Sequence, residues 1–478
     1  MRSWGWVLVL ALLLGGVLGI RALTEPVPRP RGAEAAPSSA EQPNVLLVTL
    51  DTVRADRVGT YGGPARTPTL DRLAAQGVRF TNAYAQLPQT VPSHASLFTG
   101  QYVSTHGLRV SLRDTLSPAA VTLAEVLARG GYHTAGLYSW YSLDAALSGL
   151  DRGFALYRSL IVRAGTRDVT PPGEAAAAWR RGENVTALYD GRADVTTDAA
   201  VAWLQDAVRA GAQPFFLWVH YRDPHYPYTP PPPFDALYAP PCAGCVDGSL
   251  ATLERLWDGW LPTPAEQARI LAAYDGELSF VDQELGRLLA ALEALGLAPR
   301  TLVVVTADHG EAFGEHDDWF HGHTLFQPNI HVPLLLRLPG RLPGGVVVAA
   351  AVQLIDILPT VLDLVGLPVP PSVEGRTLLP LVEGREGRER VAVAETADQQ
   401  YSALVHEGWK LIRDNLSGQR WLYHLATDPG EEHDQAAGAG ALADRLEALL
   451  EEALANRGAQ GHAGGRGAGA VGQAGSGE

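Results

Sequence analysis

The sequence predicts an α/β protein in which a large, doubly wound and mostly parallel sheet is followed by a small C-terminal α+β subdomain. Short continuous apolar runs at 44–50, 214–220 and 301–306 are typical of strands buried on both faces of a parallel sheet. Helical segments separate these runs, and such alternation is the pattern of a doubly wound fold. After residue 345 the expected elements are shorter: strands at 394–396, 402–406, 409–413 and 421–424, then a helix at 441–455.

Residues that favour helix starts and stops bound the expected helices of the large domain. One helix at 69–76 ends at Gly77, and a long one at 264–295 begins after Thr263. Another is expected at 118–129, begun by Ser117 as N-cap and stopped by Gly130. Within 89–100, Pro92 suits a first helical turn and Gly100 a helix end, which places Thr90 just before the helix N-terminus.

Composition narrows the function classes. The 478 residues are 46% hydrophobic, enough for a large core and two or three domains. Acidic residues outnumber basic ones by 52 to 37, which argues against nucleic acid as a partner, because polyanions are held by many Lys and Arg contacts. The only lysine is Lys410.

The N-terminal segment predicts export. An apolar run at 4–20 would span roughly 26 Å as a helix, close to the ~30 Å hydrocarbon core of a bilayer. It fits a signal peptide or an uncleaved signal anchor at 1–21, and both alternatives stay open. We expect a periplasmic or extracellular protein, with a flexible linker at 22–42, a large α/β domain at 43–345, a C-terminal subdomain at 346–455 and a disordered Gly/Ala-rich tail at 456–478. Cys242 and Cys245 are expected to close a small loop disulfide.

Polar side chains follow each of the three apolar runs. Asp51 follows the first, Asp308 and His309 follow the third, and the second ends in His220, Asp223 and His225. Ligands of open α/β sheets bind beyond the carboxyl ends of the strands, so these residues can converge. Taken singly, an Asp after a strand is an ordinary turn or helix-capping residue, and Thr90 an ordinary N-cap. Thr90 at a helix N-terminus also suits a bound or developing oxyanion.

Several segments together resemble the sulfatase family of the alkaline phosphatase superfamily. They include NVLLVTLDTVRADRVGTYG (44–62), TPTLDRLAAQGVRF (67–80), TVPSHASLFTG (90–100), 274–282, VVVTADHGEAFGEH (303–316), 321–339 and DILPT (356–360). The similarity extends from about residue 44 to 435 in matching order and spacing. It implies the family's α/β fold and a metal-dependent ester hydrolase.

The resemblance also implies roles for single residues. Asp51, Asp308 and His309 match metal ligands, and Thr90 stands at the nucleophile position, where it would also touch the metal. The remaining expected catalytic residues are His225 beside the anionic oxygens or the leaving group, His321 where sulfatases commonly have a lysine, and His94 in place of the arginine of the Cys/Ser-x-Pro-x-Arg signature.

Departures from the family pattern shift the expected chemistry. Thr90 is neither of the residues, Cys or Ser, from which formylglycine is made, and Lys410 cannot supply the two lysines that usually surround the sulfate. A phosphorylated threonine can be resolved by a second in-line attack, which slightly favours phosphate mono- or diesters over sulfate esters and suggests a Thr-nucleophile branch. Thr52 replaces the second Asp of the usual pair, so Mn²⁺ or Zn²⁺ fits better than Ca²⁺. One divalent metal is favoured, with two metals as the alternative.

The sequence therefore predicts hydrolysis of an anionic ester, carried by a glycan, a lipid head group or a small molecule. One alternative is a membrane-anchored transferase of phospho-head groups to envelope glycans, and another is an inactive binding protein. His220 is open between supporting the site and simple core packing. The other histidines are expected at the surface or in packing, although His323 could line the pocket. The aromatic residues Trp218, Tyr221, Tyr226 and Tyr228, with the prolines at 230–233, would either form a wall of the cleft or cover apolar surface.

Overall fold

The computed structural model describes residues 42–459 except 241, 243 and 388, without the side chains of 456–459. All of these residues fall within one compact unit, 39–478. The expected N-terminal segment, nearly all of the linker and the tail beyond 459 lie outside the described residues. Within the described part of the chain, no helix is both long and apolar enough to cross a bilayer.

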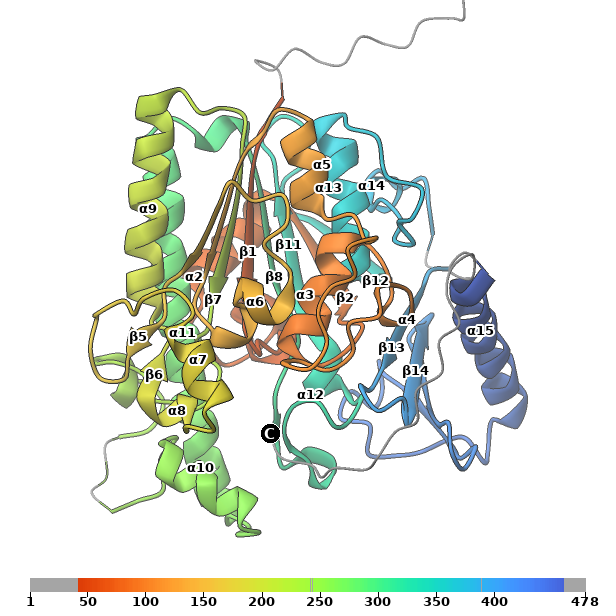
Figure 1. The fold of residues 1–478 in the computed structure, drawn as a ribbon. Coiled ribbons are helices and arrows are strands. Elements are labelled where there is room, and N and C mark those ends of the chain that lie inside the picture. Colours follow the sequence, from red (N-terminus) through yellow and green to blue (C-terminus); the bar gives the residue numbers. More distant parts are fainter. Residues whose placement is uncertain (1–41, 241, 243, 388, 460–478) are drawn as a thin grey trace, which may run out of the picture. The chain divides into compact units, whose positions relative to one another are not determined.

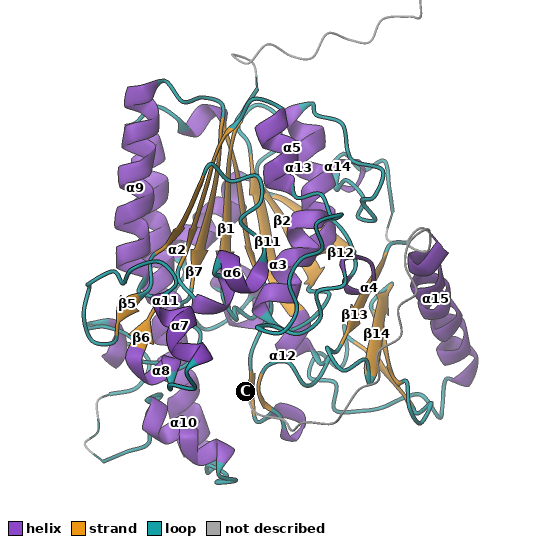
Figure 2. Ribbon diagram, viewed as in Figure 1, coloured by secondary structure: helices purple, strands orange, loops and turns teal. Residues whose placement is uncertain are grey.

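A mixed, mostly parallel sheet of eight strands forms the centre of the protein (Figures 1 and 2). Only β11 runs antiparallel to its neighbours, β2 and β8. The order across the sheet is β12 (Val346–Gln353), β2 (Val78–Tyr84), β11 (His331–Arg337), β8 (Thr301–Ala307), β1 (Asn44–Leu50), β7 (Phe215–Tyr221), β3 (His133–Tyr138) and β4 (Leu156–Ser159). This confirms the predicted fold class.

The three central strands end in register. In the parallel pairings of β1, Leu50 lies opposite Ala307 of β8 and Tyr221 of β7. Every residue of these three strands is buried, in agreement with their continuous apolar sequence. The residues that follow β1 and β8, and those at the end of β7, therefore meet at one edge of the sheet.

Helices cover both faces of this sheet (Figure 1). One face carries α2 (Pro68–Gln76), α9 (Ala193–Ala210) and α11 (Pro264–Ala294), and the other α3 (Thr90–Thr99), α5 (Leu123–Arg129) and α13 (Ile357–Val365). Shorter helices lie in the connections: α4 (Val103–His106), α6 (Ala145–Ser148), α7 (Glu174–Arg180), α8 (Val185–Leu188), α10 (Leu250–Trp257), α12 (Gln327–Ile330) and α14 (Leu379–Val382). Two small two-stranded sheets pair β5 (Val162–Arg163) with β6 (Tyr189–Asp190) and β9 (Ala312–Phe313) with β10 (Trp319–Phe320).

Local capping explains where the helices begin. Thr263 and Glu266 form a capping box at the start of α11, as the sequence suggests. The expected start of α5 at Ser117 is wrong, because Thr122 and Glu125 form a capping box five residues later. Ser117 instead opens a turn whose carbonyl oxygen accepts a hydrogen bond from the Ala120 N–H at 3.0 Å.

The C-terminal part forms a four-stranded antiparallel sheet with α15 (Gly440–Ala459) packed against it. Its strands are β13 (Val391–Glu395), β14 (Tyr401–His406), β15 (Trp409–Asp414) and β16 (Arg420–His424). The expected boundary after residue 345 differs from this arrangement, because β12 pairs with β2 at the edge of the large sheet. The last helix also runs four residues into the segment expected to be disordered.

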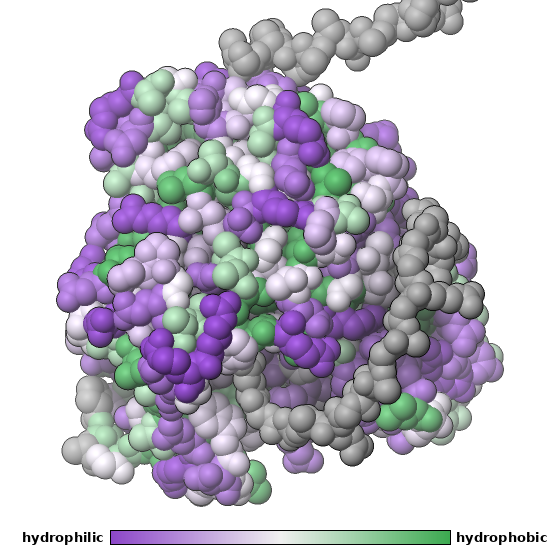
Figure 3. All heavy atoms as spheres, viewed as in Figure 1, coloured by the Kyte–Doolittle hydropathy of each residue, from purple (hydrophilic) through white to green (hydrophobic). Residues whose placement is uncertain are grey.

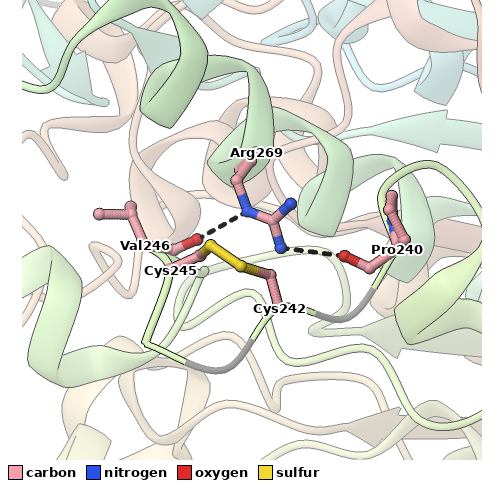
Figure 4. The surroundings of a disulfide bond; sticks show 5 residues. All are labelled: Pro240, Cys242, Cys245, Val246 and Arg269. Atoms are coloured by element: carbon pink, nitrogen blue, oxygen red, sulfur yellow. Dashed lines mark hydrogen bonds between the residues drawn. A yellow bond between two sulfur atoms is a disulfide. The ribbon is translucent and has the colours of Figure 1, made fainter.

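Cys242 and Cys245 are joined by a disulfide in the loop before α10, as expected (Figure 4). Arg269 of α11 donates hydrogen bonds to the carbonyl oxygens of Val246 and Pro240, which flank the two cysteines. The loop is thereby tied to the long helix. On the face of the molecule seen in Figure 3, hydrophobic residues are scattered among hydrophilic ones.

His106 is a buried, neutral residue that links α3 to the loop following α4 through two hydrogen bonds. Its Nδ1 accepts a hydrogen bond from the Leu108 N–H at 3.2 Å, so Nε2 carries the hydrogen and donates to Ser96 Oγ at 2.9 Å. Burial, helped by the positive charge of Arg109, lowers the pKa of His106 from 6.5 to about 3.

Replacing His106 with Gln should therefore weaken the pH dependence of stability. Between pH 6.5 and 5 the unfolded chain binds a proton at this position that the folded chain does not, so folding stability falls as the pH is lowered. This contribution amounts to about 2 kcal/mol over that interval. Urea unfolding at both pH values measures it. His133→Gln, at an exposed position, is the control and should show the wild-type change in the free energy of unfolding between the two pH values. An equal change in wild type and His106→Gln would contradict the assignment.

Candidate functional site

Two carboxylates and an imidazole meet at the carboxyl edge of the central strands. His309 Nε2 lies 3.8 Å from Asp51 Oδ1 and 3.6 Å from Asp308 Oδ2, and all three side chains are fully buried. The backbone N–H groups of Thr52 and His309 both donate to Asp308 Oδ1, at 3.2 and 2.8 Å, which leaves Oδ2 facing the cluster. His309 Nδ1 donates to the Gly310 carbonyl at 3.0 Å, so its Nε2 presents a lone pair to the carboxylates.

This cluster fits a divalent cation. Both oxygens of Asp51 and Oδ2 of Asp308 are buried and accept no hydrogen bond from any described residue. Burial raises the pKa of Asp51 to about 7, which shows how unfavourable this carboxylate is without a compensating charge. The mixed oxygen and nitrogen donors suit Mn²⁺ or Zn²⁺ better than Ca²⁺, which takes six to eight oxygen ligands.

Thr90 joins this cluster from the first turn of α3. The preceding Gln89 is the N-cap residue and makes no side-chain capping bond, and Gly100 ends the helix with φ +63°. Thr90 is thus the first helical residue rather than the N-cap, and its Oγ1 lies 3.5 Å from His309 Nε2. Ser93 Oγ donates to the Asp308 carbonyl at 2.6 Å, which fixes the helix against the end of β8.

His94 differs from the expectation of a substrate-contacting residue. Its Nδ1–H donates to the Thr90 carbonyl at 2.7 Å, and its Nε2 accepts from Thr49 Oγ1 at 3.0 Å. Thr49 Oγ1 in turn accepts a hydrogen bond from Trp218 Nε1 at 3.0 Å. Burial lowers the pKa of His94 to about 4, so it is neutral, and it does not line the cleft. Its contacts orient the first turn of α3 from behind.

His225 and His321 lie together on the open side of the cluster. Their ring centroids are 5.3 Å apart, and the His321 ring is 4.5 Å from that of His309. Burial holds the pKa of His225 well below its usual range and lowers that of His321 to about 4. His225 Nδ1–H donates to the Tyr226 carbonyl at 2.8 Å, so Nε2 carries the lone pair.

Glu311 is the site residue that sequence reasoning did not single out. Its Oε1 lies 2.8 Å from His321 Nδ1, and its Oε2 accepts a hydrogen bond from the Tyr228 hydroxyl at 2.9 Å. Burial raises the pKa of Glu311 to about 8. The sequence feature that could have identified Glu311 is its position two residues after His309 in the ADHGE segment.

A cleft of about 870 Å³ opens over these groups, and its wall includes Thr90, His225 and His321. His323 and Tyr226 also line it, whereas Trp218, Tyr221 and Tyr228 are core residues at 0 to 2% exposure. The expected aromatic wall therefore consists of Tyr226 from that group together with aromatic residues from other segments.

Two further residues of the second apolar run have different positions. Asp223 points away from the cluster, and its Oδ2 accepts from the Ala193 N–H at 2.7 Å. Asp223 is therefore not among the described groups that could share a metal ion with Asp51, Asp308 and His309. His220, by contrast, reaches the cluster, with Nε2 3.4 Å from Asp51 Oδ2.

The fold and this site define a class of ester hydrolase, and comparison with known proteins gives the family. The family model described as Sulfatase matches residues 43–367, and one described as N-sulphoglucosamine sulphohydrolase, C-terminal, matches residues 314–457. The chain belongs to the sulfatase family and is a hydrolase acting on ester bonds. Members of this family typically bind a divalent metal, in agreement with the buried Asp/His cluster.

Individual relatives show the breadth of this family. The chain is 27% identical to an arylsulfatase of Clostridium perfringens, over 82% of this chain and 89% of that protein. It is 26% identical to an N-acetylglucosamine-6-O-sulfatase of Bacteroides thetaiotaomicron, over 82% of each. The solved structure of a phosphonate monoester hydrolase of Agrobacterium radiobacter superposes with a TM-score of 0.66 at 25% identity, covering 88% of this chain and 96% of that one.

Proposed function

We propose that this protein hydrolyses a sulfate or phosphate ester through Thr90 as nucleophile, with phosphate mono- or diesters favoured. The observation that carries the proposal is the placement of Thr90 Oγ1 at the N-terminus of α3, 3.5 Å from His309 Nε2 and on the wall of the cleft. The positive end of a helix dipole stabilises a developing alkoxide and the anionic group it attacks.

A single divalent cation is part of this proposal. Asp51, Asp308, His309 and the Thr90 oxygen would hold it, and it would supply positive charge that acidifies the hydroxyl and stabilises the group being transferred. The partners already described for Asp223 support one metal rather than two.

The two histidines on the cleft wall, His225 and His321, have different roles in proton transfer. His225 Nε2 carries a lone pair and accepts the Thr90 proton as Oγ1 bonds to phosphorus or sulfur. Burial raises the pKa of Glu311 to about 8, so its carboxyl group is protonated and donates to His321 Nδ1. His321 Nε2 then carries the hydrogen that it donates to the alcohol oxygen as the bond from that oxygen to the same atom breaks. Water then attacks the Thr90-bound group, passing its proton to His321 while His225 returns the first proton to the threonine oxygen.

The preference for phosphorus rests on what surrounds the nucleophile. A threonine cannot form the aldehyde hydrate that releases sulfate by elimination, but its phosphate ester is open to a second in-line attack. Lys410, the only lysine in the chain, is fully buried and paired with Glu431 at 2.7 Å, outside the cleft. Resemblance to a phosphonate monoester hydrolase also supports this choice.

Replacing Thr90 with Ala should lower kcat by at least ~10³-fold while leaving the fold intact, because the attacking oxygen is removed. Thr90→Ser keeps a hydroxyl and should retain measurable turnover. Assays on matched aryl sulfate, phosphate monoester and phosphodiester substrates, with divalent metal added, compare the variants. Mass spectrometry of a rapidly quenched wild-type reaction should find one phosphoryl group on the peptide that contains Thr90.

Undiminished hydrolysis by Thr90→Ala would contradict the role of Thr90. A strong preference of the wild type for the aryl sulfate would contradict the preference for phosphorus, without affecting the threonine assignment.

We also propose that the protein works outside the cytoplasm. The apolar segment at 4–20 and the disulfide between Cys242 and Cys245 support this, because disulfides persist mainly in oxidising compartments. Cell fractionation should recover the full chain outside the cytoplasm and a chain starting at residue 43 inside it. Equal distribution of the two chains would contradict export by this segment.

A further inference from the structure

The cleft around Thr90 carries negative rather than positive charge. Its described lining includes the carboxylates of Glu183, Asp317 and Asp318 and contains no Arg or Lys. The hydrogen bond with Asp318, whose Oδ1 lies 3.5 Å from His323 Nδ1, raises the pKa of His323. The charge of His323 is therefore balanced by its own neighbour.

Two nearby arginines are held in other contacts. Arg222 is 2% exposed, lies over the Trp140 ring at 4.2 Å and binds Asp190 at 2.7 Å. Arg181 pairs with Glu183 at the surface. Neither arginine lines the cleft, and Asp317 is the lining carboxylate that has no ion-pair partner among the described residues. A second anionic group on a substrate would therefore meet this negative charge and no free cation.

Aromatic side chains supply most of the large apolar surface of the same cleft. Tyr226 packs edge to face against Trp257 and Phe320, with ring centroids 5.8 and 5.1 Å apart. Trp257 is 50% exposed, which leaves ring surface available to a ligand. Such faces favour rings, hydrocarbon and cationic groups. The aromatic lining includes Trp140, Trp179, Tyr226, Trp257, Trp319 and Phe320.

We propose that the cleft selects esters whose alcohol part bears a ring and is uncharged or positively charged, and rejects alcohol parts that carry further negative charge. This inference rests on the proposed function, because it takes the transferred anionic group to sit at Thr90. It separates this chain from enzymes that act on polyanionic glycans, in which each added charge must find a cationic partner.

Three phenyl phosphate esters test the inference. They differ only in the para substituent, which is aminomethyl, methoxymethyl or carboxymethyl. The methylene group keeps the leaving-group pKa values similar, so differences in kcat/KM report the cleft. At low salt the carboxymethyl ester should be roughly tenfold poorer than the neutral one, and the difference should shrink as salt screens the charges. The aminomethyl ester should be at least as good as the neutral one.

A charge-removing variant locates the effect. Asp317→Asn takes one carboxylate from the lining, and Asn tolerates the left-handed backbone at this position, where φ is +58°. It should improve the relative kcat/KM of the carboxymethyl ester several-fold. Asp206→Asn, which removes the same charge from a 69%-exposed position on α9, is the matched control and should leave the ratios unchanged.

Binding measurements distinguish a failure of this inference from a failure of the proposed function. Calorimetry with benzylphosphonates carrying the same three substituents measures Kd without turnover. Equal Kd values, or tightest binding of the carboxymethyl compound, would overturn the cleft inference. The expected order of Kd values without hydrolysis of any ester would overturn the proposed function alone.

A separate observation concerns His220, whose hydrogen-bond partners define its tautomer. Ser139 Oγ has one hydrogen and lies 2.8 Å from the His220 carbonyl but 3.4 Å from Nδ1, so the hydrogen goes to the carbonyl. Nδ1 must then carry its own hydrogen in order to face Oγ favourably. Nε2 is left with a lone pair, is buried and has no hydrogen-bond partner among the described residues.

That lone pair faces a carboxylate. His220 Nε2 lies 3.4 Å from Asp51 Oδ2, and both side chains are 0% exposed. Two lone pairs at this distance in a dry interior repel unless a positive charge lies between them. Ligands about 2.0–2.2 Å from a shared cation are separated by roughly 3–4 Å from one another, as these atoms are. His94 also lies near Asp308, but both of its nitrogens are already hydrogen-bonded.

We infer that His220 is a second imidazole ligand of the cation held by Asp51, Asp308 and His309. Mn²⁺ bound to the metal-free protein tests this, because electron spin-echo spectroscopy counts directly coordinated histidine nitrogens. Wild type should show two. His220→Asn, whose shorter side chain withdraws the ligand atom, should show one and bind Mn²⁺ at least roughly tenfold more weakly. His220→Gln, which places an oxygen near the Nε2 position, should recover part of the affinity.

The control is His106→Asn, which alters another fully buried neutral histidine away from the metal cluster and should keep two coupled nitrogens. A single nitrogen in the wild type, or two in His220→Asn, would overturn the inference. The wild-type count decides the question even if the His220 variants do not fold.

Discussion

Two carboxylates buried at the end of the central strands impose the main constraint on this structure. Asp51 and Asp308 are completely removed from solvent, and three of their four oxygens accept no hydrogen bond from the described residues. Such charges are unfavourable unless a compensating positive charge is present. The nitrogens that His220 and His309 turn toward these carboxylates carry lone pairs rather than hydrogens, which is the arrangement expected around a cation. The expectation of a bound cation therefore rests on the unpaired oxygens and nitrogens of this interior as well as on the motif.

The surrounding elements hold this cluster in position. Parallel pairing of β1 with β7 and β8 brings the strand ends together, and the Ser93 hydrogen bond to Asp308 fixes α3 against them. His94 belongs to a series of hydrogen bonds that also holds α3 in place. The series runs from Trp218 through Thr49 and His94 to the Thr90 carbonyl. His94, which stands where the family signature has an arginine, thus orients the first turn of α3, and Thr90 with it, without lining the cleft.

Charge is distributed differently in the two parts of the site. Next to Thr90 the groups suited to an anion are a helix N-terminus, imidazoles and the cation that Asp51, Asp308 and His309 would hold, whereas the remainder of the cleft is aromatic and acidic. The substrate that we propose therefore has one anionic end and one uncharged or cationic end. Lys410 is the only lysine in the sequence and does not line the cleft, and the structure shows that arginines are absent from the described lining as well.

The sequence by itself determined the fold class, the family and the residues that follow the central strands, because these depend on local apolar runs and on motif order. It did not determine which ring nitrogens are free to bind a metal. The sequence therefore could not distinguish His94, whose two nitrogens are both hydrogen-bonded, from His220, whose Nε2 faces Asp51. It also missed Glu311, whose importance comes from its contact with His321. The start of α5 and the place of β12 depended on a capping box and on strand pairing. Tertiary structure decided these points because hydrogen-bond partners, burial and the lining of a cleft arise between segments distant in sequence.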